Sequence, residues 1–97
     1  MQFLVVTSLK LEAPNSVPSD TFHQLIEEET AQTRREYLAG SLRQIWLRTE
    51  GQGAIAIVEA DSLKAAQALI EAFPLFKADM VDAEIISLSP YSGFGPV

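Results

Sequence analysis

Glu29 is placed by its spacing where a carboxyl group could transfer a proton. Phe22, Leu25 and Ile26 predict the inward stripe of a helix, in which successive residues turn by about 100°. Glu29 follows Phe22 by seven residues and Ile26 by three, so it points along the same stripe. Apolar surroundings raise the pKa of a carboxyl group, which suits a general acid or base near neutral pH.

The sequence leaves two interpretations of Glu29 open. It is the proton carrier of an active site, or it is one half of a structural ion pair with an arginine of a neighbouring strand. Arg43 and Arg48 have an odd spacing, which puts them on opposite faces of a strand, so at most one of them can face a given cavity. Trp46 and Leu42 are expected on the face of Arg48, with Trp46 in a core, an interface or a pocket wall.

Few other residues suggest chemistry. Lys10 follows the first apolar run and is expected either at the mouth of a cavity or extended into water. His23 is the one histidine and the chain has no cysteine, so neither a transition-metal site nor a disulfide is expected. No Gly-rich loop leads from a strand into a helix and no serine lies in a nucleophile elbow, so neither phosphate cradling nor acyl transfer is predicted.

Length and composition predict one globular domain. The chain has 97 residues, 47% apolar and 21% charged, so it can bury a core and is not of the disordered class. The net charge is -6 and the seven Lys and Arg are scattered, which argues against a nucleic-acid surface but allows a small anionic or apolar ligand. The opening "MQFLVVTSLK" is too short to span a membrane and lacks the basic start of a signal peptide, so a cytoplasmic location is expected.

Hydrophobic periodicity predicts four strands and two helices. The strands are expected at 2–9, 42–49, 54–59 and 80–88, and the helices begin at Ser19 or Asp20 and at Asp61 or Ser62. Gly40 is expected to end the first helix, and "EGQG" is expected to join the middle strands as a hairpin. Residues 1–97 thus form one domain, with a core of residues 1–88 and a tail of residues 89–97.

The order βαββαβ predicts a ferredoxin-like α+β sandwich. Right-handed crossovers then put both helices on one face of a four-stranded antiparallel sheet. The first and third strands are apolar on both faces, although the helices cover only one face. A second copy of the chain is expected to cover the open face, which predicts a homodimer packed sheet to sheet. The alternative is a monomer with a half-exposed apolar sheet.

The segment "FPLF" (Phe73–Phe76) marks the end of the second helix. Pro74 interrupts the helical pattern, so Phe73, Leu75 and Phe76 do not form an ordinary helix stripe. They are expected to form an apolar hinge, which belongs either to the core or to a site.

Several segments, taken in order, resemble the muconolactone isomerase family. They are the opening "MQFLV", Glu29 eleven residues before Gly40, "LRQIWLR" just after that glycine, and "FPLF" with Met80 soon after it. The resemblance covers nearly the whole chain. It implies a ferredoxin-like fold of the dimeric α+β barrel type, assembled as a homodimer or as a larger ring of dimers.

The same resemblance implies an activity and a site. Members of that family shift a carbon–carbon double bond within an unsaturated lactone that carries a carboxylate, and they need no cofactor. Such chemistry requires a base beside the lactone carbonyl and a group that holds the developing enolate. By resemblance, Glu29 carries the proton, Arg43 binds the anion and Trp46 forms a pocket wall. The expected site has Glu29 and Arg43 as catalytic residues, with Trp46, Phe73, Leu75, Phe76 and Lys10 around the substrate.

The chain departs from the family at positions that are usually polar. Leu4, Thr30, Ile55 and Ser89 stand where the family usually has a histidine, a lysine, a polar residue and a second histidine. Two functions are therefore considered: an isomerase centred on Glu29, and a non-catalytic small-ligand-binding or assembly module on the same dimeric fold. Haem-degrading monooxygenases share this fold and are a third option, in which His23 would meet the haem.

Overall fold

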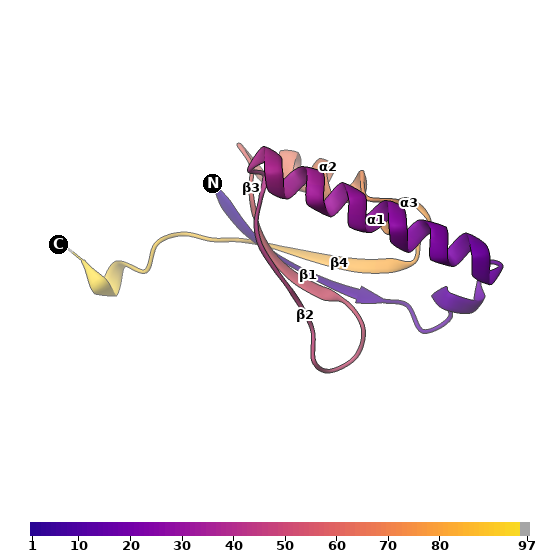
Figure 1. Cartoon of the computed structure of the whole chain (residues 1–97). Coiled ribbons are helices and arrows are strands. Elements are labelled where there is room, and N and C mark those ends of the chain that lie inside the picture. The colour runs from indigo at the N-terminus through magenta and orange to yellow at the C-terminus, as the bar shows by residue number, and fades with distance from the viewer. Residues whose placement is uncertain (96–97) are drawn as a thin grey trace.

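The apolar runs and helical stripes form the elements that their periods predict. The computed structural model describes residues 1–95. Its elements are β1 (Gln2–Leu9), the short 3-10 helix η1 (Ala13–Asn15), α1 (Ser19–Ala39), β2 (Leu42–Leu47), β3 (Ala54–Glu59), α2 (Leu63–Glu71), α3 (Pro74–Lys77), β4 (Val81–Ser87) and the 3-10 helix η2 (Ser92–Phe94) (Figure 1).

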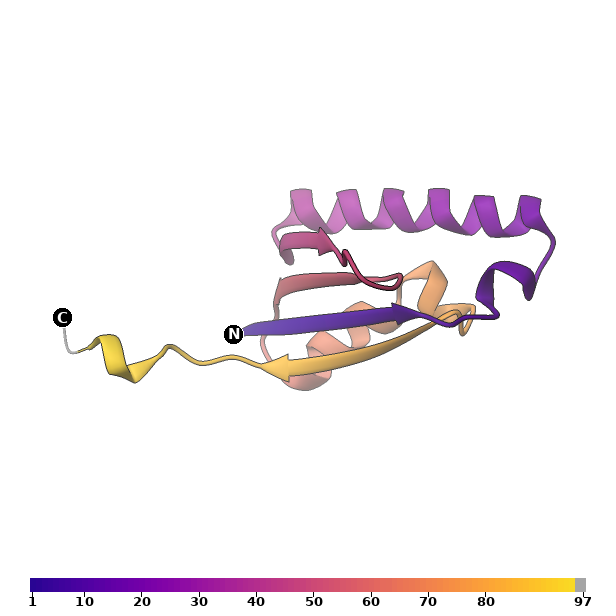
Figure 2. The ribbon, with the colours of Figure 1, turned by 90° about the horizontal axis from the view of Figure 1, so that it is seen from below.

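The four strands form one antiparallel sheet in the order β2-β3-β1-β4. Helices α1 and α2 lie on the same face of this sheet, with α1 alongside β2 and α2 behind β4 (Figures 1 and 2). The fold is therefore the predicted ferredoxin-like α+β sandwich of the dimeric α+β barrel type. On this face the two helices lie over opposite edges of the sheet, because α1 contacts β2 and α2 contacts β4.

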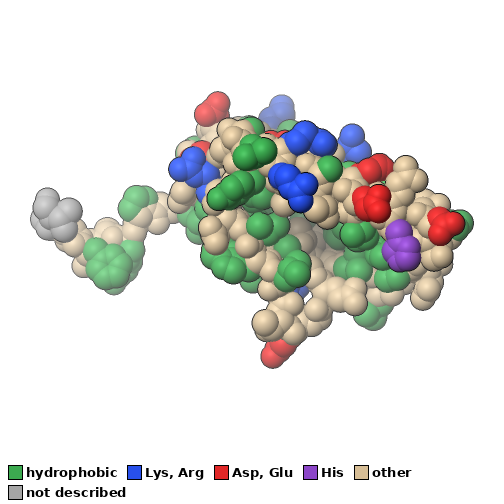
Figure 3. All heavy atoms as spheres, in the orientation of Figure 1, with side chains coloured by type: hydrophobic (Ala, Val, Ile, Leu, Met, Phe, Trp, Pro, Cys, Tyr) green, Lys and Arg blue, Asp and Glu red, His purple; other side chains and the backbone are tan. Residues whose placement is uncertain are grey.

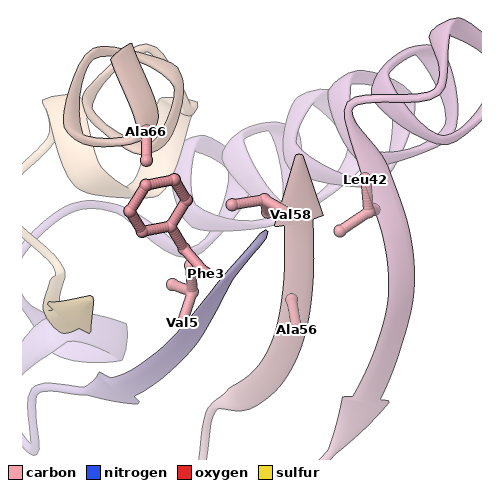
Figure 4. Packing of buried hydrophobic residues seen from close by; sticks show 6 residues of the cluster. All are labelled: Phe3, Val5, Leu42, Ala56, Val58 and Ala66. Carbon is pink, nitrogen blue, oxygen red and sulfur yellow. The ribbon is translucent and has the colours of Figure 1, made fainter. Parts of the chain in front are cut away.

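The main core lies between α2 and the two central strands. Phe3 on β1 pairs in register with Val58 on β3, and both side chains point toward α2, where Ala66 is also fully buried (Figure 4). Val5 and Leu42 extend this cluster toward β2. A small residue at position 66 lets α2 approach the Phe3 ring closely, and Ala66 is fully buried, whereas α1 has no fully buried residue.

The proline hinge belongs to a second core cluster. Helix α2 ends at Glu71, and Pro74 begins the short helix α3, where its missing N–H costs no hydrogen bond. Leu75 is buried with Ala13 and Met80, and Phe22 of α1 packs against them. The hinge therefore anchors the N-terminal part of α1 to the end of the sheet.

The helix ends agree with the sequence in three cases out of four. Gly40 adopts a positive φ of 92° at the end of α1, and the Ser62 hydroxyl accepts the Ala65 N–H at 3.0 Å at the start of α2. Pro74 separates α2 from α3, as the hinge predicts. The prediction that Ser19 or Asp20 caps α1 was wrong, because Pro18 is the capping residue and no side chain makes a cap hydrogen bond there.

Strand β2 contains a bulge that the sequence did not predict. Leu42 pairs with Val58, but the next pair along the ladder is Gln44 with Ile57, so Arg43 is the extra residue. The bulge turns Leu42 to the helix side, where it is 4% exposed, while Trp46 remains on the other face. The expectation that Leu42 and Trp46 share a face was therefore wrong.

The second face of the sheet is covered by no element of residues 1–95. It carries the apolar residues Leu4, Val6, Ile55, Ile57, Trp46 and Ile86, as the register of the strands requires. After β4 the chain leaves the sheet as an extended tail that ends in η2 (Figures 1 and 2). Among the described helices, none is both long enough and apolar enough to cross a membrane.

Candidate active site

Two connected hollows lie between α1 and the sheet. An inner cavity of about 70 Å³ reaches under α1 to the core, and an outer groove of about 360 Å³ runs from it to the turn between β2 and β3. The two share Thr7, Glu29, Thr33, Ile45, Ala54 and Val81 in their walls. Figure 3 shows apolar side chains on both sides of the hollow beneath α1. The two hollows therefore adjoin at a shared wall that includes Glu29.

Glu29 lies on the boundary between the inner cavity and the groove. Its Oε1 atom accepts a hydrogen bond from the Leu75 N–H at 3.0 Å, which ties α1 to α3. Among the described residues, no hydrogen-bond partner is found for Oε2. Burial raises the pKa of Glu29, and the Leu75 hydrogen bond opposes this effect only in part. The carboxyl group is thus oriented through one oxygen and available through the other.

The structural ion pair that the sequence left open is not formed within the described chain. Arg43 is exposed in the β2 bulge and lines neither hollow. Arg48 donates through Nη1 to the Ser8 Oγ at 2.6 Å and to the Thr7 carbonyl at 3.2 Å, which holds it against β1. Glu29 is therefore neutralised by neither arginine, and the structure does not bring Glu29 and Arg43 together.

The other predicted site residues divide into two groups. Phe73 and Phe76 line the inner cavity, and Leu75 lines the groove, so the hinge contributes to a site as well as to the core. Trp46 is 50% exposed on the opposite face of the sheet. Lys10 pairs with Asp79, with 2.7 Å between Nζ and Oδ1, and lines neither hollow.

Five polar wall residues were not predicted as site residues: Thr7, Thr30, Thr33, Glu36 and Gln52. Glu36 is the one that can carry a charge. It follows Glu29 by seven residues on the same helix face, so the period that identified Glu29 could also have identified it. Its Oε1 accepts the Ser41 hydroxyl at 2.6 Å and its Oε2 accepts the Gln32 amide at 3.0 Å. Glu36 is therefore held in place at the wall of the inner cavity.

Thr7 and Thr33 line both hollows, and both hydroxyls are already engaged. Thr7 donates to the Ala54 carbonyl at 3.3 Å and accepts the Ala54 N–H at 3.0 Å. Thr33 donates to the Glu29 carbonyl at 2.8 Å. Thr7 could have been found by alternation on β1, because it follows Phe3 and Val5 on the buried face.

The arrangement suits proton transfer to and from carbon better than metal or haem chemistry. Within residues 1–95, no three His, Cys, Asp or Glu side chains are close enough to hold a metal ion. His23 is exposed on α1 and lines neither hollow, so it does not offer a haem ligand inside the site. Glu29 Oε2 lies in a largely apolar wall with no hydrogen-bond partner among the described residues, and a carboxylate there can remove and return a proton.

Comparison with known proteins gives one family and two similar structures. A family model described as muconolactone delta-isomerase matches residues 1–93. A crystal structure of muconolactone isomerase has a TM-score of 0.80 and 23% identity, over 94% of this chain and 91% of that chain. The 5-chloro-2-hydroxyhydroquinone dehydrochlorinase of Burkholderia phenoliruptrix AC1100, in complex with 2,5-dihydroxybenzoquinone, has a TM-score of 0.68 and 14% identity, over 96% and 98%. Both structures are similar to this chain in fold. No match was found among curated proteins.

Proposed function

The chain belongs to the muconolactone delta-isomerase family, and from this premise we propose that it moves a carbon–carbon double bond within a small unsaturated lactone by proton transfer. The single observation that carries the proposal is Glu29, whose carboxyl group faces an apolar hollow with one oxygen anchored and the other available. No cofactor enters the reaction, because one base and a carbonyl that accepts the electron pair are sufficient.

The proposed steps balance without a further reactant. In a butenolide whose ring double bond is conjugated with the carbonyl, as in muconolactone, Glu29 Oε2 removes a proton from the saturated ring carbon at the far end of that double bond. The electron pair of the broken C–H bond moves through the ring to the carbonyl oxygen and gives a dienolate. The protonated Glu29 then returns the proton to the carbon next to the carbonyl, and the double bond re-forms between the other two ring carbons. The Leu75 N–H holds Oε1 throughout, so the carboxyl group keeps its orientation between the two transfers.

A matched pair of variants tests this proposal. Glu29→Gln keeps the size of the side chain but removes the base, and we expect kcat/KM for muconolactone or a related butenolide to fall by about 10²–10⁴-fold. Glu27→Gln makes the same change on an exposed position of α1 and is the control. Activity is followed by the loss of absorbance as the ring double bond moves out of conjugation with the carbonyl. Full activity in the Glu29 variant, or no turnover of any butenolide by the native chain at high enzyme concentration, contradicts the proposal.

A non-catalytic binding module is the second candidate, and the exposed position of Arg43 favours it. The resemblance assigned the anion-binding role to this residue, yet its side chain lines neither hollow. A module of this kind would bind butenolides with a measurable Kd but would leave them unchanged. Calorimetry and the turnover assay on the same samples separate the two functions.

The assembly that we propose is a homodimer through the open face of the sheet. What supports it is the apolar character of that face, on which Ile55 and Ile57 of β3 lie next to Val6 and Leu4 of β1. Trp46, half exposed at its margin, adds an aromatic side chain of the type that is enriched in interfaces. A second copy offers the same apolar face and covers all of it at once.

A further inference from the structure

We infer that the site selects uncharged lactones and discriminates against substrates that carry a carboxylate. This inference rests on the proposed function, because it names the substrate class of the same site. It departs from the small anionic ligand that the sequence allowed, and it follows from the charges around the two hollows.

The ionisable side chains that line the hollows are all acidic. Among the described wall residues, only Glu29 and Glu36 can carry a charge, and no Lys, Arg or His is present. Ser41 and Gln32 both donate hydrogen bonds to the Glu36 carboxylate, so this negative group is fixed at the wall of the inner cavity. The net charge of -6 has the same sign. An entering carboxylate therefore meets Glu29 where the two hollows adjoin and Glu36 at the wall of the inner cavity.

Among the described residues, Lys10, Arg43 and Arg48 line neither hollow. Lys10 pairs with Asp79, and Arg48 binds Ser8 and the Thr7 carbonyl. Arg43 is exposed in the bulge at the edge of the sheet. An anionic group that leaves water for the cavity would thus gain no ion pair, and desolvation of an unpaired charge in an apolar wall is costly.

The walls instead fit a flat, uncharged ring. Helix α1 lines the inner cavity with polar residues, and the wall opposite it is aliphatic and aromatic, including Leu42, Val58, Leu69, Ile70, Phe73 and Phe76. The wall hydroxyls of Thr7 and Thr33 already donate to backbone carbonyls. Gln52, at the mouth of the groove, is the uncharged side chain left to donate to a lactone carbonyl. Recognition is therefore by shape and apolar contact, with Glu29 as the reacting group.

Muconolactone and its methyl ester form a matched pair of probes that differ by one negative charge. We expect the native chain to convert the ester with a kcat/KM at least tenfold higher than the acid. In Glu36→Gln the ratio of kcat/KM for the ester to kcat/KM for the acid should fall, because one of the two negative wall residues is removed. The exposed control Glu27→Gln should keep the ratio of the native chain. Equal or higher kcat/KM for the acid overturns the inference.

Binding measurements separate this inference from the proposed function. If neither probe is converted, the isomerase proposal fails, but the Kd values of acid and ester, measured by calorimetry, still decide the charge preference. An ester that binds at least tenfold more tightly supports the inference, and an acid that binds equally or more tightly overturns it. Conversion of both probes with preference for the acid supports the isomerase and overturns the inference.

Discussion

Two opposing effects set the proton affinity of Glu29. The apolar side chains that surround the hollow disfavour the ionised carboxylate, and the Leu75 N–H favours it, with burial the larger effect. Because the pKa in the folded chain is raised above that of an unfolded chain, the protonated form is the one that favours folding. The contribution of Glu29 to stability is present at acidic pH and is lost as the pH rises through the raised pKa.

Glu29→Gln should therefore stabilise the fold at neutral pH. Glutamine keeps an oxygen for the Leu75 N–H but carries no charge, so the free energy of unfolding should rise at pH 7 by up to about 1 kcal/mol, since part of the carboxyl group remains solvated. At pH 4 the gain should disappear, because Glu29 is then protonated in both states. Glu36, the other titratable group in these walls, is the same in both proteins. Urea denaturation at the two pH values measures the difference.

Glu27→Gln is the control for this titration, because position 27 is exposed on α1. It should leave the pH dependence of unfolding unchanged. A Glu29→Gln variant that is less stable than the native chain at pH 7 would show that a partner stabilises the carboxylate. It would contradict the view that burial disfavours its ionised form.

Among the elements, the turn of the β2–β3 hairpin contains two glycines with positive φ, whose replacement should destabilise the fold. Gly53 has a φ of 148°, and a Cβ atom built there would lie 2.0 Å from the Thr7 carbonyl oxygen of β1. Gly51, in the same turn, has a φ of 72° and open space around it. One turn thus contains a glycine required by conformation and contact, and another required by conformation alone.

Gly53→Ala should destabilise the chain by at least about 2 kcal/mol, because backbone strain and a clash with backbone add together. Gly51→Ala, the matched variant, should cost about 1 kcal/mol for its left-handed conformation. Urea denaturation of the two variants gives the comparison. An equal loss in both would mean that the Thr7 contact at position 53 relaxes without cost.

The elements also show what the sequence could and could not predict. Glu29 and the "FPLF" hinge were found because helical period and proline position are local signals. The exposed position of Arg43 was not predicted, because the bulge depends on how β2 pairs with β3. The pairing of Leu42 with Val58 and of Gln44 with Ile57 is a matter of register between two segments, which β2 alone does not determine. An alternation rule applied to β2 alone reverses the face of Leu42. Glu36 was within reach of the same period and was missed.

At the scale of the whole molecule, the open face of the sheet is the surface through which we propose that the homodimer forms. Ile57 lies on β3 between Leu4 of β1 and Gln44 of β2, so it is central to this face. A charge at position 57 would be buried without a partner in a face-to-face dimer. The free energy of desolvating it would strongly destabilise the interface.

Ile57→Glu should therefore convert the proposed homodimer to a monomer at micromolar concentration. Leu38→Glu makes a similar change on α1, where the side chain is 78% exposed, and should leave the dimer intact. Analytical ultracentrifugation or light scattering measures the mass of each protein. A native chain that is already monomeric at this concentration would contradict the sheet-to-sheet assembly.

The bulge in β2 also bears on how the chain avoids fibrils. β2 is an edge strand, because the sheet order gives it β3 as its single neighbour, and the edge strands of a native sheet are templates on which further chains can add. A face-to-face dimer does not cover this edge. The irregular ladder at Arg43, together with its charge, interrupts the template within the strand. Deleting that residue would restore a regular edge next to Ile45 and Leu47, and with it a route to stacked, insoluble polymers.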